Sequence, residues 1–282
     1  MNPRKATPIE ITKIISLWKS IFSDSDDFVN RFITHFGTER CYVCEITGEI
    51  VAMAFALPSS ISNKIQKFKN SNLKSQPQNL TSLRYVYACA TRPQYRRQGV
   101  MAKLLETIYN EACRENIGGI FLHAADQNLE NYYRRLGFEN FFFRDSATFF
   151  KQREREGYKK HTDMQFITPD VYSKKRLQKL ENYYFIDWNE SFFYFLHETG
   201  MQFCEYKNDI FSLSIENETI IIDELLGDTP KEEIASLIFK HFTDFKTVEI
   251  SYPGQKNCYG QIKWCKPQNE NLCKGYFTFA ME

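Results

Sequence analysis

The sequence predicts a mixed α/β fold built from two similar units that follow one another along the chain. The chain has 282 residues, which is long for a single domain. Helical and strand-like patterns of apolar residues alternate along it. Moreover, the element order expected for residues 1–150 recurs in residues 151–282 without visible sequence identity. We therefore expect two tandem domains with these bounds; the alternative is an unrelated α/β unit in the second half.

The first half is predicted to contain two helices, a hairpin, a strand, a helix, a strand, a short helix and a closing strand. Ile11, Ile14 and Trp18 have helical spacing in the first helix, and Thr47-Gly48 is the hairpin turn. A polar stretch between the hairpin and the next strand predicts a long loop. The elements, with this loop, are expected over residues 9–22, 23–36, 41–46, 50–58, 59–80 (loop), 83–91, 98–115, 120–125, 128–136 and 138–150.

The second half repeats this order after a charged connector over residues 151–168. Its expected helices are 170–182, 189–200 and 230–242, and its expected strands are 202–207, 210–216, 219–227, 246–253 and 275–281. Seven aromatic residues of this half either line an acceptor pocket or form the core of the unit. They are Tyr183, Tyr184, Phe185, Trp188, Phe192, Phe193 and Tyr194.

The bulk composition excludes several classes of protein. A formal net charge of +1 argues against a general nucleic-acid binder. No apolar run is long enough to span a membrane and no signal-peptide core is visible, so we expect a cytoplasmic protein. The eight cysteines are expected to be reduced and mostly core residues. Cys41 and Cys44 lie in a predicted strand, where odd spacing sends their side chains to opposite faces, so no metal site is expected.

The stretch TRPQYRRQGVMAKLL places cations and a glycine where a strand meets a helix. Positive charge at a helix N-terminus is locally unfavourable unless an anion binds there. Gly99 would let the backbone approach such a ligand, the first helical N–H groups would point at it, and Arg96 and Arg97 would add charge-assisted hydrogen bonds. The stretch therefore indicates a pyrophosphate site, with a solvated basic loop as the alternative.

Two segments resemble the signature of the GNAT superfamily of acetyl-CoA-dependent N-acetyltransferases. In residues 83–105 the strand is followed by RRQGVM, and in residues 121–138 a strand and a short helix lead to YRRLGF. Met101 departs from the family pattern, which has a small residue there. The tandem arrangement further resembles acetyltransferases of the enhanced-intracellular-survival type, whose second GNAT-like unit is degenerate. Asp228, Glu232 and Glu233 fit this resemblance because they would repel a pyrophosphate.

The resemblance implies a transferase that uses acetyl-CoA as co-substrate and has a GNAT fold in both units, the second without a cofactor. It implies that Tyr133 is the general acid toward the CoA sulfur. It also implies that the cofactor contacts Cys89, Ala90, Thr91, Arg96, Arg97, Gln98, Gly99, Val100, Met101 and Ala102. The first three would pair with the pantetheine arm through their backbone, and residues 97–102 would hold the pyrophosphate.

The acceptor and the general base stay open at this point. Glu45, His123, Asp126 and the terminal carboxylate of Glu282 are candidate bases. The acceptor is expected to be a small-molecule or peptide amine, with no nucleic-acid or membrane partner, and a homo-oligomer is left open. A non-catalytic acyl-CoA-binding or interaction protein is the main alternative. Aminoacyl transfer from a charged tRNA is a further one, disfavoured by the lack of a basic surface signal.

Overall fold

The computed structural model describes residues 2–63, 81–151, 164–266 and 274–281. The chain divides into two compact units, each of them discontinuous. The first comprises residues 1–61, 80–141 and 260–273, and the second comprises residues 62–79, 142–259 and 274–282. The predicted domains 1–150 and 151–282 stay a prediction, and the compact units differ from them chiefly because the first takes in a segment from near the end of the chain.

The first unit has a sheet with the strand order β1-β2-β3-β4-β5-β14. Only the pairing of β4 with β5 is parallel; the other neighbours are antiparallel. Its strands are β1 (Asn2–Lys5), β2 (Cys41–Ile46), β3 (Glu49–Asn63), β4 (Thr81–Thr91), β5 (Gly119–Leu122) and β14 (Asn257–Trp264). Its α-helices are α1 (Ile11–Lys19), α2 (Asp26–Phe36), α3 (Val100–Arg114) and α4 (Gln127–Arg135). Short 3₁₀ turns are η1 (Pro8–Glu10), η2 (Thr38–Arg40) and η4 (Pro93–Tyr95).

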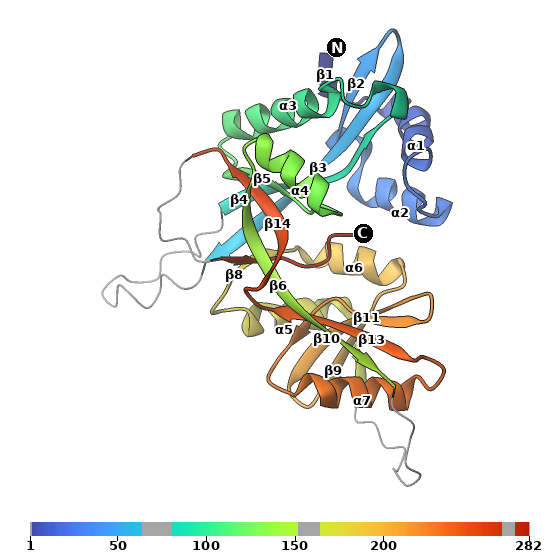
Figure 1. Ribbon diagram of the computed structural model, residues 1–282, viewed down its shortest axis with the longest axis vertical. Coiled ribbons are helices and arrows are strands. Elements are labelled where there is room, and N and C mark those ends of the chain that lie inside the picture. Colours follow the sequence, from blue (N-terminus) through green and yellow to red (C-terminus); the bar gives the residue numbers. More distant parts are fainter. Residues whose placement is uncertain (1, 64–80, 152–163, 267–273, 282) are drawn as a thin grey trace, which may run out of the picture. The chain divides into compact units, whose positions relative to one another are not determined.

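Helices cover both faces of this sheet (Figure 1). On one face, Trp18 of α1 and Phe32 of α2 pack against Phe55 and Tyr87, with ring centroids 5.0–5.8 Å apart. On the other face, Leu104, Leu105 and Ile108 of α3 pack with apolar residues of β2, β3 and β4. Side chains alternate between the faces of a strand, which explains why the aromatic and the aliphatic residues separate into two layers.

The second unit repeats this plan with different strands. Its sheet has the order β6-β13-β11-β10-β9-β7. The strands are β6 (Glu139–Phe150), β7 (Gln165–Ile167), β8 (Tyr184–Asp187), β9 (Gln202–Tyr206), β10 (Asp209–Glu216), β11 (Thr219–Ile222), β12 (Leu225–Leu226), β13 (Thr247–Pro253) and β15 (Gly275–Tyr276). The helices are α5 (Pro169–Lys179), α6 (Glu190–Glu198) and α7 (Lys231–His241). The parallel pair β11–β13, joined through α7, corresponds to β4–β5 joined through α3.

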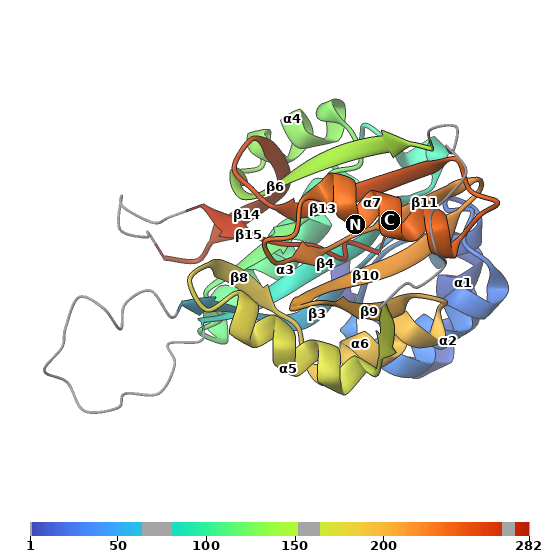
Figure 2. The ribbon, with the colours of Figure 1, turned by 90° about the horizontal axis from the view of Figure 1, so that it is seen from below.

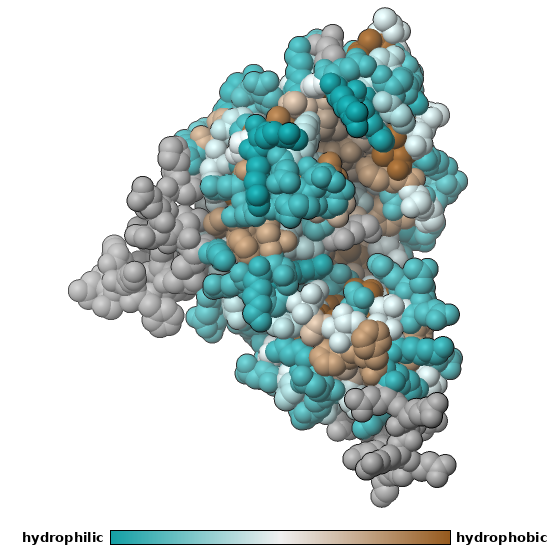
Figure 3. All heavy atoms as spheres, viewed as in Figure 1, coloured by the Kyte–Doolittle hydropathy of each residue, from teal (hydrophilic) through white to brown (hydrophobic). Residues whose placement is uncertain are grey.

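Two separate layers of side chains also form the core of the second unit. Tyr172 of α5 and Phe193 of α6 contact Phe203 of β9. The neighbouring Cys204 belongs instead to the apolar cluster beneath α7. Figure 2 shows α5 and α6 on one side of β9 and β10. On the face visible in Figure 3, hydrophilic residues cover much of each unit and the hydrophobic patches are small.

The mixed α/β architecture with two similar units is confirmed, whereas several local expectations were wrong. β1, β7, β8 and β14 were not predicted. β7 lies within the expected connector over residues 151–168, of which residues 152–163 lie outside the described residues. β3 continues to Asn63, into the expected loop, and residues 64–80 of that loop lie outside the described residues. Only residues 275–276 of the expected last strand pair as a strand, since Phe279 and Met281 both have a left-handed backbone.

The expectation that the cysteines are reduced was wrong for one pair. Cys113, in the last turn of α3, is bonded to Cys265, which directly follows β14. The two residues are 152 positions apart, so no local spacing motif reveals the pair. Other contacts hold β14 at the same place: the Tyr109 hydroxyl donates to the Trp264 carbonyl at 3.1 Å, and the Lys263 ammonium donates to the Leu136 carbonyl at 2.8 Å.

The sequence predicts neither a metal site nor a membrane span, and the structure bears on these two expectations only for the described residues. Within it, no group of histidine, cysteine, aspartate or glutamate side chains is arranged to hold a metal ion. No helix within it is both long enough and apolar enough to cross a membrane.

Candidate active site

A bulge in β4 turns one cysteine toward α4. Met53 of β3 pairs with Ala90 and Phe55 pairs with Tyr87, so Ala88 and Cys89 both stand opposite Ala54. Ala88 takes a left-handed φ of 52°, which is uncommon for a residue other than glycine. The additional residue shifts the alternation of side chains, as bulges do. Tyr87 therefore packs on the face of Trp18, whereas Cys89 packs on the opposite face, against the cluster that contains Tyr133.

β4 and β5 separate just before this bulge. Their parallel pairing covers Leu83, Arg84 and Tyr85 of β4 only. Among the described residues, the β5-facing edge of residues 86–91 has no partner strand. The predicted pantetheine contacts Cys89, Ala90 and Thr91 all lie on this stretch. An extended ligand could therefore add to the sheet here through backbone hydrogen bonds alone.

The turn between β4 and α3 exposes a set of unpaired backbone donors. Arg97 and Gly99 both have a left-handed backbone, with φ of 61° and 76°. The first helical hydrogen bond runs from the Lys103 N–H to the Gly99 carbonyl at 3.0 Å. Within the described residues, the N–H groups of residues 97–102 have no acceptor. Such a run of free amides at a helix N-terminus is a ready anion site.

The side chains of this turn divide into those that hold the loop and those that are free for a ligand. Arg96 Nε donates to the Thr91 carbonyl at 3.1 Å, and Gln98 Nε2 donates to the Gln94 carbonyl at 2.9 Å. Arg97 is exposed and has no such partner in the described chain. Val100 is buried, Ala102 is half-buried, and Met101 packs against the core cluster. Met101 therefore points away from the proposed path of the pyrophosphate.

Tyr133 lies on α4 with 5% of its surface exposed. Its ring packs against Phe138 at 5.8 Å and Tyr132 at 5.3 Å between centroids. Its hydroxyl lies close to the Cys89 thiol, and each group affects the pKa of the other. Burial, with Cys89 close by, raises the pKa of Tyr133 well above its ordinary value of 10.0, so the phenol stays protonated at neutral pH. The site thus holds a protonated donor, the Tyr133 hydroxyl, on the same face as Cys89 of the bulge.

The candidate bases are mostly engaged in structural contacts. The Asp126 carboxylate accepts the Leu129 N–H at 2.8 Å and caps α4. The Glu45 carboxylate pairs with Arg4 at 2.8 Å. His123 directly follows β5 and is half-buried. Glu282 lies outside the described residues. No base is assigned from these positions.

The second unit fills its equivalent turn with its own carboxylate. Between β12 and α7, the N–H groups of Asp228 and Thr229 donate to the Asp209 carboxylate at 3.2 and 2.8 Å. Asp209 is 4% exposed. Glu233, in the first turn of α7, pairs with Lys207 at 2.6 Å. An internal anion therefore stands where the first unit has free amides, a feature that the sequence did not reveal.

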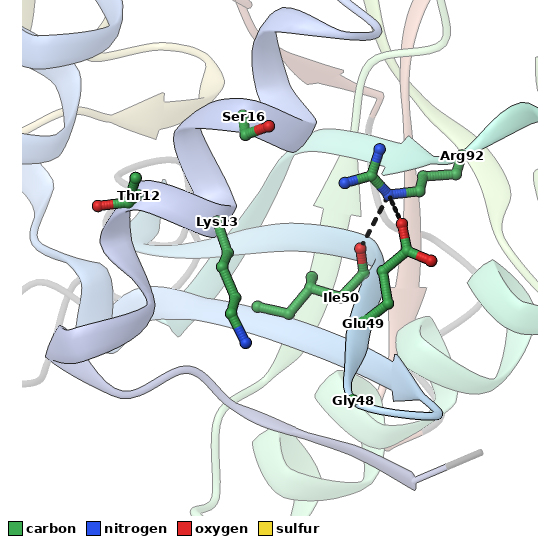
Figure 4. Close-up of a pocket in the computed structure, with 7 residues that line it drawn as sticks. All are labelled: Thr12, Lys13, Ser16, Gly48, Glu49, Ile50 and Arg92. Atoms are coloured by element: carbon green, nitrogen blue, oxygen red, sulfur yellow. Dashed lines mark hydrogen bonds and ion pairs between the residues drawn. The ribbon is translucent and has the colours of Figure 1, made fainter.

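A separate pocket of about 370 Å³ lies in the first unit between α1, the β2–β3 turn and Arg92 (Figure 4). The Arg92 guanidinium is already bound there, to the Glu49 carboxylate at 2.8 Å and the Ile50 carbonyl at 3.2 Å. None of the predicted cofactor contacts lines this pocket. Of the seven aromatic residues predicted as a pocket or a core, Phe185, Trp188, Phe192 and Phe193 are buried, Tyr184 is half-buried, and Tyr183 and Tyr194 are exposed.

A strand with a bulge, a neighbouring strand that diverges from it and a helix N-terminus with free amides together form a candidate site for an extended, anionic ligand. Residues 2–141 match the acetyltransferase (GNAT) domain family. Residues 2–141 therefore form a GNAT acetyltransferase domain, and the chain as a whole has the fold of a tandem pair of such units. A search of curated protein sequences finds no match.

Several solved structures are similar over nearly the whole chain. A conserved protein from Enterococcus faecalis V583 has a TM-score of 0.69 at 12% identity, covering 94% of this chain and 72% of its own. Eis1 from Mycobacterium abscessus has a TM-score of 0.62 at 11% identity, covering 94% and 74%. A tandem GNAT protein from the clavulanic acid biosynthesis pathway has a TM-score of 0.52 at 10% identity, covering 95% and 98%. At these identities the similarity shows the fold alone.

Proposed function

We propose that this chain transfers an acetyl group from acetyl-CoA directly to an amine acceptor. The observation that supports it most is the run of free backbone N–H groups over residues 97–102, at the end of a strand whose edge is open. A pyrophosphate fits the free amides and the exposed Arg97, and a pantetheine arm fits the edge of residues 89–91.

In this proposal Tyr133 assists the departure of the CoA thiolate. Attack of the amine on the thioester carbonyl forms the new C–N bond, and the C–S bond breaks. The sulfur then takes a proton from, or a hydrogen bond of, the Tyr133 hydroxyl. General acids in such positions contribute about 10²–10⁴ in rate. A buried phenol with a raised pKa is held in the protonated form that this role requires.

The amine must lose a proton before it can attack. An alkylamine has a pKa near 10.4, so only about one molecule in 10³ is free base at pH 7. Deprotonation therefore costs on the order of 4 kcal/mol, which a base or a water chain must help to supply. The acceptor stays open: a small amine, a peptide N-terminus or a lysine side chain fits the proposal.

Calorimetric titration with acetyl-CoA, followed by a thiol-release assay over a panel of amines, tests this proposal. We expect binding, and thiol release with at least one amine. Arg97→Ala should weaken binding by about 1–3 kcal/mol for one charge-assisted contact, and more at low than at high ionic strength. Arg97→Lys is the matched control that keeps the charge. Binding without thiol release for any amine would favour the non-catalytic acyl-CoA-binding function instead.

A further inference from the structure

The bulge in β4 and helix α4 bring a thiol and a phenol together at the proposed reaction site. Without the bulge, Cys89 would continue the alternation of Tyr85 and Tyr87 and would face α1. With it, Cys89 lies on the face of Tyr133 and packs against the same apolar cluster. The left-handed φ of Ala88 holds this arrangement within the strand itself.

We propose that Cys89 is a positioning residue, whose thiol holds the Tyr133 hydroxyl at the place where the CoA sulfur leaves. This inference rests on the proposed acetyl transfer. In this proposal the phenol O–H donates to the Cys89 sulfur, which the bulge brings to the face of Tyr133, so that it is already oriented toward a sulfur acceptor beside the cofactor edge. When acetyl-CoA is bound, the same O–H can turn from the Cys89 sulfur to the CoA sulfur.

The weakness of the thiol as an acceptor is what suits it to this role. A buried hydroxyl without a partner would be costly, so a phenol that awaits its substrate needs an interim acceptor. Sulfur accepts weakly, so the exchange to the developing thiolate is favourable. Burial raises the pKa of the Cys89 thiol to about 12. The thiol therefore stays neutral and does not compete as a nucleophile at neutral pH.

Steady-state kinetics of four proteins tests the role: wild type, Cys89→Ala, Tyr133→Phe and the double variant. We expect Cys89→Ala to lower kcat by about three- to tenfold, the equivalent of one oriented hydrogen bond, with KM for acetyl-CoA unchanged. In the Tyr133→Phe background the same substitution should have no further effect. Cys89→Ser keeps an acceptor, but a stronger one, and should therefore recover only part of the kcat lost in Cys89→Ala. Cys44→Ala is the matched control, because it removes another free thiol from the same cluster.

A second measurement does not depend on turnover. Alkylation of Cys89 by a maleimide, followed by peptide mass spectrometry, should be several times slower in Tyr133→Phe, because the phenol no longer stabilises the thiolate. An unchanged alkylation rate would overturn the contact. If Cys89→Ala lowers kcat equally in the wild-type and Tyr133→Phe backgrounds, or if Cys89→Ala alone keeps the wild-type kcat, the positioning role is wrong. Full activity of Tyr133→Phe alone would instead remove the proposed acid, so the two failures are distinguishable.

Discussion

The Asp209 carboxylate accepts the backbone N–H of Thr229 at 2.8 Å, at the turn of the second unit that corresponds to the proposed pyrophosphate site of the first. A buried carboxylate bound to these amides excludes a phosphate by charge and by occupancy. We therefore predict one acetyl-CoA per chain. Calorimetry should give a stoichiometry near one, and Gly99→Glu should reduce it to none. A value near two would show that the second unit binds cofactor as well.

Gly99→Glu should abolish acetyl-CoA binding while the protein stays folded. A Cβ at Gly99 would meet no atom within 4 Å, so the new side chain has room, but it places negative charge at the free amides. Its φ of 76° adds about 1–2 kcal/mol of backbone strain for any L-residue. Gly99→Ala carries that strain without the charge and is the control. If the two variants bind equally well, the charge has no effect and the anion site is elsewhere.

Tyr133→Phe should lower turnover at least tenfold, with acetyl-CoA affinity and melting temperature nearly unchanged, because it removes only the hydroxyl. The raised pKa of the phenol implies that wild-type turnover loses nothing through Tyr133 as pH rises toward 10. A kcat–pH profile with chemistry shown to be rate-limiting checks both points. Unaltered turnover in Tyr133→Phe would leave this tyrosine with a packing role only.

Acid should weaken the first unit through Glu10. The hydrogen bonds of Arg4 and Thr7 lower the pKa of the Glu10 carboxyl from 4.5 to about 2. The folded-state pKa lies below the unfolded one, so this group contributes stability above about pH 4.5 and loses that contribution as pH falls toward 2. We expect the melting temperature of wild type to fall more steeply over this window than that of Glu10→Gln. Parallel curves would contradict the assignment.

Reduction of the Cys113–Cys265 bond should destabilise the protein. Disulfides that close long loops contribute about 2–5 kcal/mol to the free energy of unfolding. We expect a lower melting temperature after treatment with a thiol reductant, and the same lower value for Cys113→Ser with or without it. Cys258→Ser changes a cysteine outside the disulfide and should keep the response to reductant. If the reductant leaves the melting temperature of wild type unchanged, this expectation is wrong.

The sequence predicts well the features that depend on local patterns. The spacing of Trp18 and its neighbours predicts α1, and RRQG between a strand and a helix predicts the anion-ready turn, because both depend on residues a few positions apart. Asp126, a candidate base in the sequence analysis, proves to cap α4.

Features that depend on distant partners were missed. β14 carries Gln261 and Lys263 among its apolar residues, and only its pairing with β5 and the Lys263–Leu136 hydrogen bond make that pattern stable as a strand. The bulge at Ala88 has no glycine or asparagine to mark its left-handed backbone. Asp209 is a charged residue of the kind usually found at the surface. Only the fold brings its carboxylate to the amides of Asp228 and Thr229.

The place of β14 beside β5 has a consequence for the synthesis of the chain. The ribosome makes Cys265 152 residues after Cys113, which is about 8–30 s later at about 5–20 residues per second. Through that interval one edge of β5 has no strand partner, although β1 to β5 and α3 have already been made. Exposed strand edges pair readily with other chains. We therefore expect the nascent chain to be prone to pairing with other chains through this edge until β14 has been synthesised.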